Sequence, residues 1–146
     1  MGIEQSLKLM QMLNNKLFDA IASAVDLDDP AEQLLAQQFM IEAVGSVTSQ
    51  LPEVAKSAAA VATRFITGAA MAEEVIAERV RLWRAIEGRD QSEEPDVLKI
   101  RTAICVLHPM DMGVSAETLE YFFAFWQQGG LPQAKLKAAV QNKYGI

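Results

Sequence analysis

Apolar side chains recur every three or four positions along almost the whole chain, and this spacing most constrains the fold. Over residues 3–25 the recurring side chains are Ile3, Leu7, Met10, Leu17, Ile21 and Val25. Such a period places them on one face of an α-helix, whereas a half-buried β-strand alternates every second residue. No alternating run of useful length occurs in the sequence. We therefore predict an all-α fold, a bundle of five to seven helices that forms a single domain over residues 1–146.

Capping residues and prolines indicate where these helices begin. Asp29 is suited to the N-cap position and Pro30 to the first helical position, while Glu32 stands where a capping-box carboxylate reaches back to the N-cap. Pro95 opens a later helix in the same way. Ser115 is a favourable N-cap for the helix that follows. The sequence thus predicts several separate helices rather than one continuous rod.

The longest regular stretch covers residues 53–87. Its apolar positions alternate steps of four and three residues, as in a heptad repeat. Gly68 and Arg79 occupy two positions of this apolar seam and weaken it, because neither has an apolar side chain. We predict a long central helical segment at about 53–87, and the sequence leaves open whether the helix continues through Gly68 or breaks there.

The charge of the chain is negative and unevenly placed. The net charge is −6, and residues 1–55 hold eight acidic and two basic side chains. This asymmetry argues against nucleic acid or an anionic membrane as the main partner and favours a basic one, although acidity also aids solubility. Arg79, Arg81, Arg84 and Arg89 flank Trp83. Interleaved glutamates, with spacings that allow Glu78–Arg81 and Arg84–Glu87 ion pairs, instead predict a solvated helix face.

The sequence predicts a cytoplasmic protein. Its single cysteine, Cys105, cannot form an intrachain disulfide. Glu4, Gln5 and Lys8 interrupt the start of the chain, which therefore does not resemble a secretory signal. No window approaches the roughly 20 apolar residues that span a bilayer.

Few residues suggest catalysis or metal binding. His108 is the only histidine, and Cys105 precedes it by three positions. A Cys-x-x-His pair supplies two ligands, but the sequence holds no second pair. Cys105 stands between Ile104 and Val106, which is typical of a buried structural cysteine. We therefore expect no catalytic residue, no metal and no cofactor.

The most informative feature is an aromatic cluster. Five of the six positions from 121 to 126 are aromatic: Tyr121, Phe122, Phe123, Phe125 and Trp126. Spacing groups Leu119, Phe122, Phe123 and Trp126 on one face of the predicted helix. Tyr121 and Phe125, at i and i+4, form another face. The first face can pack on the bundle, and the second belongs either to the core or to an interface with another chain.

The leading functional hypothesis is a non-enzymatic, acidic protein-binding module. Inhibitors, immunity proteins and secretion chaperones act in this way, and the partner would be a basic polypeptide or a second copy of the chain. The predicted contact residues are Tyr121, Phe125, Trp126, Asp26, Asp28, Asp29 and Glu32. The alternatives are a small-molecule or lipid-binding bundle or a helical enzyme, and a structural component that assembles through the apolar seam of the 53–87 segment.

Overall fold

The computed structural model describes residues 16–109 and 114–146, and every regular element among them is helical. The predicted all-α fold is confirmed, with seven helices in the described part of the chain. Residues 16–24 form the first of these. The others are α2 (Pro30–Gly45), α3 (Ala58–Ile66), α4 (Ala72–Ala85), α5 (Pro95–Ile104), α6 (Ala116–Gln128) and α7 (Gln133–Tyr144), with the short 3-10 turns η1 (Thr48–Gln50) and η2 (Glu53–Ala55) after α2. The rest of the helix expected over residues 3–25 lies outside the described residues.

The helix starts follow the capping prediction, with one correction. The Asp29 side chain accepts a hydrogen bond from the backbone N–H of Ala31 at 3.0 Å, and Pro30 is the first residue of α2. The capping box with Glu32 is wrong, because the N–H of Asp29 donates to the carbonyl oxygen of Asp26 instead. Ser115 caps α6 by accepting from the N–H of Thr118.

The predicted long segment 53–87 is helical over most of its length but is divided at Gly68. Gly68 adopts a φ of +81°, a left-handed conformation that glycine tolerates best. The backbone N–H groups of Ala69 and Ala70 donate to the carbonyl oxygen of Arg64 and close the turn. The chain then reverses, so that α4 packs against α3, and Arg64 forms an ion pair with Glu74 across the two helices. The break is therefore the correct alternative.

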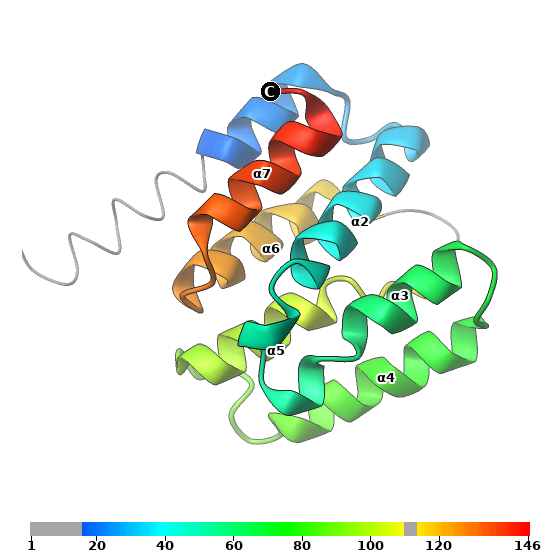
Figure 1. Cartoon of the computed structure of the whole chain (residues 1–146), viewed down its shortest axis with the longest axis vertical. Coiled ribbons are helices and arrows are strands. Elements are labelled where there is room, and N and C mark those ends of the chain that lie inside the picture. Colours follow the sequence, from blue (N-terminus) through cyan, green and yellow to red (C-terminus); the bar gives the residue numbers. More distant parts are fainter. Residues whose placement is uncertain (1–15, 110–113) are drawn as a thin grey trace, which may run out of the picture.

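The aromatic face of α6 lies in the core. Leu119, Phe122, Phe123 and Trp126 are each at most 1% exposed. Phe39 of α2 stacks on the ring of Phe123, with 5.7 Å between the centroids. In Figure 1, residues 16–24, α2, α6 and α7 occupy one half of the molecule, and α3, α4 and α5 occupy the other. Packing of α5 on α6 joins the two halves.

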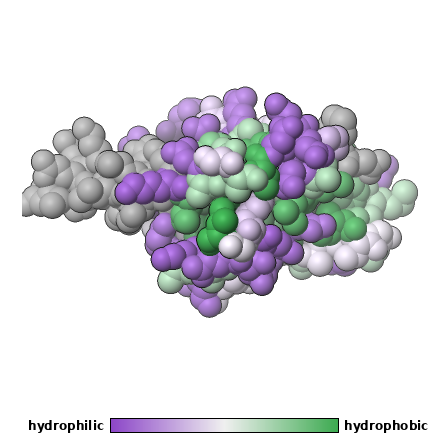
Figure 2. All heavy atoms as spheres, turned by 90° about the horizontal axis from the view of Figure 1, so that it is seen from above, coloured by the Kyte–Doolittle hydropathy of each residue, from purple (hydrophilic) through white to green (hydrophobic). Residues whose placement is uncertain are grey.

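The surface carries hydrophilic side chains with smaller hydrophobic areas between them. Figure 2 shows this mixture on the face where the C-terminal residues lie. Among the described residues, the large apolar side chains that are at least 40% exposed are Leu34, Ile66, Met71, Ile76, Val80, Tyr121 and Ile146. Within the part of the chain that the structure describes, none of the helices has the length and apolarity that crossing a membrane requires.

Candidate functional site

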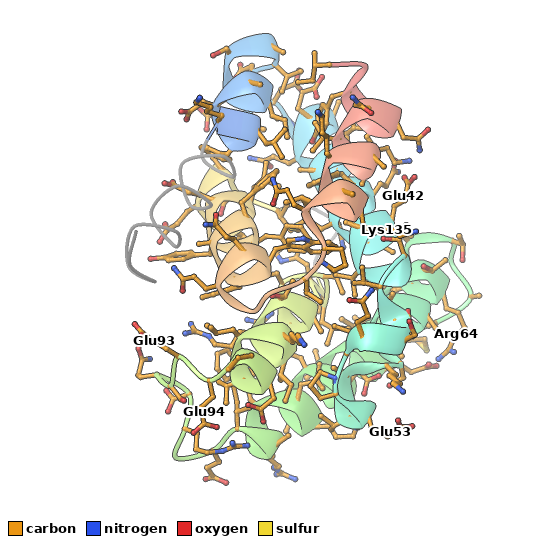
Figure 3. All side chains as sticks on the ribbon, turned by 60° about the vertical axis from the view of Figure 1, so that its left-hand side comes forward. Glu42, Glu53, Arg64, Glu93, Glu94 and Lys135 are labelled. Atoms are coloured by element: carbon orange, nitrogen blue, oxygen red, sulfur yellow. The ribbon has the colours of Figure 1, made fainter. Side chains whose placement is uncertain are left out.

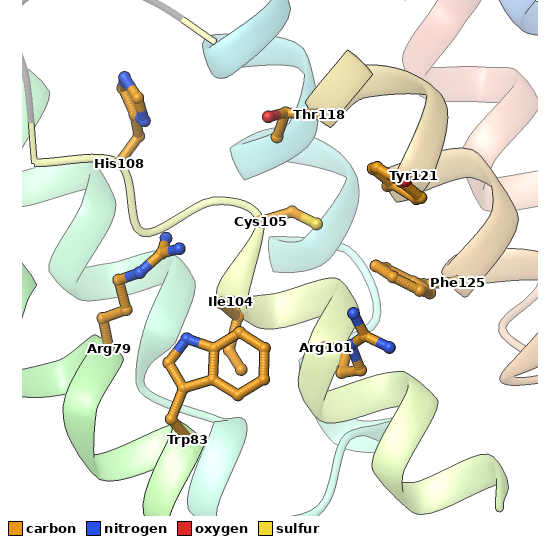
Figure 4. Close-up of a pocket in the computed structure, with 9 residues that line it drawn as sticks. All are labelled: Arg79, Trp83, Arg101, Ile104, Cys105, His108, Thr118, Tyr121 and Phe125. Carbon is orange, nitrogen blue, oxygen red and sulfur yellow. The ribbon is translucent and has the colours of Figure 1, made fainter. Parts of the chain in front are cut away.

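A cavity of about 320 Å³ opens between α4, α5 and α6. Figure 4 shows the side chains that surround it. Its lining combines cationic, aromatic and small polar groups: Arg79, Trp83, Arg101, Ile104, Cys105, His108, Thr118, Tyr121 and Phe125. Among the described residues, no aspartate or glutamate lines this cavity. The lining therefore differs in charge from the chain as a whole, whose net charge is −6.

Arg101 reaches from α5 to residues on both sides of the cavity. Its guanidinium carbon lies 4.3 Å from the centroid of the Phe125 ring and 5.8 Å from that of Trp83. These distances allow cation–π attraction to both rings. Its Nη1 also donates to the carbonyl oxygen of Asp90 at 3.2 Å. Arg101 is thus held in place by contacts with α4, α6 and the loop before α5.

Arg79 is anchored on the other side of the cavity. It lies on α4, and its Nη1 donates to the carbonyl oxygen of Leu107 at 3.1 Å. Within the described ranges, no carboxylate lies within ion-pair distance of Arg79 or Arg101. The two guanidinium groups are therefore oriented by backbone carbonyls and carry positive charge that no described carboxylate pairs with at close range.

Tyr121 and Phe125 form a stacked aromatic pair in the wall of this cavity. Their rings are stacked, with centroids 5.9 Å apart and an angle of 13° between the planes. Tyr121 is 52% exposed, whereas Phe125 is half-buried. Figure 4 shows Phe125 between Tyr121 and Arg101. Tyr121 therefore reaches the solvent and does not belong to the core of this chain.

Cys105 lies in the wall of the cavity with its thiol protonated. Although part of the residue reaches the solvent, burial of the thiol raises its pKa from 9.0 to about 12, and the charges of Arg79 and Arg101 oppose this shift only in part. A thiolate, not a thiol, acts as a nucleophile. The geometry therefore gives no support to a catalytic cysteine.

Trp126 requires a correction. The sequence placed it among the partner-contacting residues, but its side chain is 0% exposed. Its indole N–H donates to the carbonyl oxygen of Pro132 at 3.1 Å, which fixes the ring beneath the turn between α6 and α7. Trp126 is thus a core residue in this structure and is not available to a partner.

The predicted acidic contact residues lie apart from the cavity lining. Asp26, Asp28 and Asp29 are exposed, but Asp26 and Asp29 accept hydrogen bonds from nearby backbone N–H groups and so stabilise the turn before α2. Glu32 is half-buried. Burial of the Tyr144 hydroxyl and, as the smaller cause, the negative charge of Glu32 raise the pKa of Tyr144 from 10.0 to about 12. The structure brings Tyr121 and Phe125 together and leaves the acidic residues outside their site.

The sequence missed the two arginines and the tryptophan of the cavity. It treated Arg79 as a defect of a helical seam and Trp83 as part of a solvated face. The Glu78–Arg81 ion pair is confirmed, but Glu78 is buried and so does not belong to a solvated face. Arg84 and Glu87 are not within ion-pair distance. Arg79 and Trp83 are four positions apart on a helix and so project from the same side. That spacing was the one available indication.

No grouping of three or more His, Cys, Asp or Glu side chains suited to a metal ion occurs within residues 16–109 and 114–146. Comparison of the chain with models of protein families, with curated proteins and with solved structures finds no match. The interpretation of the site therefore rests on its own geometry.

Proposed function

We propose that the chain is a non-enzymatic binding module that docks a protein partner at the cavity between α4, α5 and α6. One observation carries this proposal: Tyr121, exposed and stacked on Phe125, stands at the edge of a cavity whose lining also includes two arginines and a tryptophan. Tyrosine, tryptophan and arginine are the residues most enriched at the energetic centres of protein interfaces. The proposal includes the cytoplasmic location expected from the sequence.

The rigidity of the pair supports this role. Phe125 contacts the guanidinium group of Arg101 on one side and Tyr121 on the other. A side chain that is already held in its bound geometry loses little conformational entropy on binding. A partner that covers the exposed half of Tyr121 therefore gains buried apolar area at low entropic cost. The acidic turn with Asp26, Asp28 and Asp29 is not part of this proposed site, because none of its residues lines the cavity.

Selection from a random peptide library displayed on phage tests the proposal. The full chain serves as bait, and enriched peptides are re-measured against Tyr121→Ser and against Ile76→Ser. Ile76 is a matched control, because it is an exposed apolar residue, at 47%, that does not line the cavity. We expect enriched peptides to lose binding to Tyr121→Ser by about tenfold or more, as for a central interface aromatic, and to retain binding to Ile76→Ser. Equal binding to both variants would contradict the proposal.

A small-molecule ligand is the second candidate, and the size of the cavity favours it. Its volume of about 320 Å³ is at the lower end of the range of roughly 300–1,000 Å³ for ligand pockets. A screen of aromatic fragments by NMR, read on the indole N–H of Trp83, distinguishes the two candidates. Saturable fragment binding in the absence of any enriched peptide would favour the small molecule.

Self-assembly through the 53–87 segment draws less support from the packing of the seam residues. Val61, Val75 and Leu82, which belong to that seam, are at most 9% exposed within one chain. Because α3 and α4 fold back on each other, these side chains pack internally and do not form a continuous apolar edge.

A further inference from the structure

The charge of the cavity is opposite to the charge of the chain. In a protein with a net charge of −6, the described cavity residues include two arginines and no carboxylate. Arg79 and Arg101 approach it from different helices. Both side chains line the same cavity, and the charges of both act on the Cys105 thiol in its wall. This local reversal of charge is the observation from which we infer the chemistry of the partner.

Both arginines hold unused hydrogen-bond donors. A guanidinium group carries five N–H donors in a planar fork. Within the described residues, Arg79 donates only from Nη1 to Leu107, and Arg101 only from Nη1 to Asp90. The Nε of Arg101 is buried without a hydrogen-bond partner in the structure. Each arginine is therefore positioned by one bond to a backbone carbonyl while most of its donors remain available.

We propose that the cavity is a carboxylate-binding site and that the partner presents an acidic segment to it. An aspartate or glutamate side chain of the partner enters between Arg79 and Arg101, and a neighbouring apolar residue of the partner packs on Tyr121. The inference rests on the proposed function and specifies its partner. Arginine–carboxylate pairs are charge-assisted and often bidentate, which makes arginine suited to recognising this group.

The acidic segment replaces the basic partner that the sequence favoured. The net negative charge of the chain acts at long range, but at physiological ionic strength charges are screened beyond about 8 Å. Contacts inside the cavity are shorter than this and are partly shielded from water, so the two arginines decide which charge binds there. The acidic residues of positions 26–32 lie outside the cavity lining and do not alter this local preference.

The test uses the peptides that the phage selection enriches. Each acidic peptide is synthesised together with a matched version in which its glutamates and aspartates are replaced by glutamine and asparagine. Affinities are measured for the full chain and for the variants Arg79→Gln, Arg101→Lys and Lys135→Gln. Lys135 is the control, because it is an exposed cation on α7 that does not line the cavity (Figure 3).

We expect amide replacement in the peptide, or Arg79→Gln in the chain, to weaken binding by about tenfold. Arg101→Lys keeps the charge but loses the planar fork, so it should weaken binding by less than Arg79→Gln. Lys135→Gln should leave the affinity unchanged. Thermal unfolding followed by circular dichroism checks that each variant is folded.

The experiments distinguish a failure of the carboxylate inference from a failure of the proposed function. If selected peptides depend on Tyr121 but bind equally well as amide versions, the carboxylate inference is wrong and the proposed function stands. If no selected peptide depends on Tyr121, the proposed function is wrong. Inorganic phosphate is tested as a competitor of the labelled acidic peptide. If phosphate displaces this peptide at the same concentration as the unlabelled peptide does, the cavity is an unspecific anion site and the inference is overturned.

Ionic quenching of tryptophan fluorescence gives a readout that needs no ligand. Trp83 lies in the cavity wall and is partly exposed, whereas Trp126 is 0% exposed and is shielded from ionic quenchers. We expect the anion iodide to quench Trp83 more efficiently than the cation caesium, and Arg79→Gln to reduce this preference. Equal quenching by both ions, or no change in Arg79→Gln, would contradict a positively charged cavity.

Discussion

The guanidinium carbon of Arg101 lies 4.3 Å above the ring of Phe125, so a cation from α5 covers an aromatic residue of α6. The same group is 5.8 Å from the centroid of Trp83 on α4 and donates a hydrogen bond to the carbonyl oxygen of Asp90. One side chain therefore connects three segments of the chain and also lines the candidate site. Its contribution to stability is measurable separately from any role in binding.

A double-mutant cycle on Arg101 and Phe125 should give a coupling free energy of about 0.5–1 kcal/mol, the usual strength of a partly exposed cation–π contact. The cycle uses Arg101→Gln, Phe125→Leu and the double variant, with free energies of unfolding obtained from urea denaturation. Arg84→Gln, at an exposed arginine of α4 that does not line the cavity, serves as the control and should change stability by less than about 0.5 kcal/mol. Strict additivity of the two substitutions would show that the contact contributes nothing.

Gly129, at the C-terminal end of α6, lies close to α5. A Cβ at this position would lie 2.9 Å from the carbonyl oxygen of Phe125 and 3.3 Å from the Cβ of Leu98. Gly129→Ala should therefore lower the free energy of unfolding by about 1–3 kcal/mol. Gly45→Ala is the matched control, because its Cβ would meet only the Cβ of Ala59 at 3.9 Å. It should be neutral or stabilise by about 0.5 kcal/mol, since alanine is the better helix former. Similar effects of the two substitutions in chemical denaturation would contradict the close packing.

Trp126 should contribute to stability and not to binding. Trp126→Phe removes buried volume and leaves the carbonyl oxygen of Pro132 without its donor, so the free energy of unfolding should fall by about 1–3 kcal/mol. Trp83→Phe, at a partly exposed position, should cost less than about 1 kcal/mol. Under conditions where both variants are folded, Trp83→Phe should weaken peptide binding and Trp126→Phe should not. A loss of affinity in Trp126→Phe at full folding would contradict its assignment to the core.

The buried thiol predicts a loss of stability at alkaline pH. The pKa of Cys105 is raised from 9.0 to about 12, so above pH 9 the unfolded chain releases a proton that the folded chain retains. Stability is therefore complete below pH 9 and falls above it, by up to about 1.4 kcal/mol per pH unit from this group. Cys105→Ala should reduce the slope in urea denaturations between about pH 8 and pH 10. An unchanged slope in the variant would show that the thiol is not the cause.

Local patterns predicted the helices well because their physical causes are local. Pro30 with its N-cap Asp29, and Ser115 at the start of α6, act within a few residues of themselves. Helical spacing divides the α6 aromatics into two faces, but it does not predict that Trp126 is buried and Tyr121 exposed. The course of the chain at Gly68 did not follow, because a glycine permits a left-handed turn without requiring one.

The cavity could not be predicted from the sequence, for a different reason. Arg79, Trp83, Arg101 and Tyr121 come from three helices, and their approach depends on how α4, α5 and α6 pack. The aromatic pair was found because its two members are neighbours on one helix. The arginines became part of the same site only through tertiary contacts, and Trp126 was misassigned because burial depends on what covers a helix and not on its own residues.

The turn at Gly68 determines which side chains meet at the proposed binding site. Because the chain doubles back there, the part of α4 that bears Arg79 and Trp83 meets the helix bearing Arg101 and, through it, the aromatic pair of α6. No contiguous stretch of polypeptide holds this combination of groups. Fragments of the chain should therefore be inert toward the partner, and ligand affinity should vanish in the same cooperative transition that melts the tertiary structure.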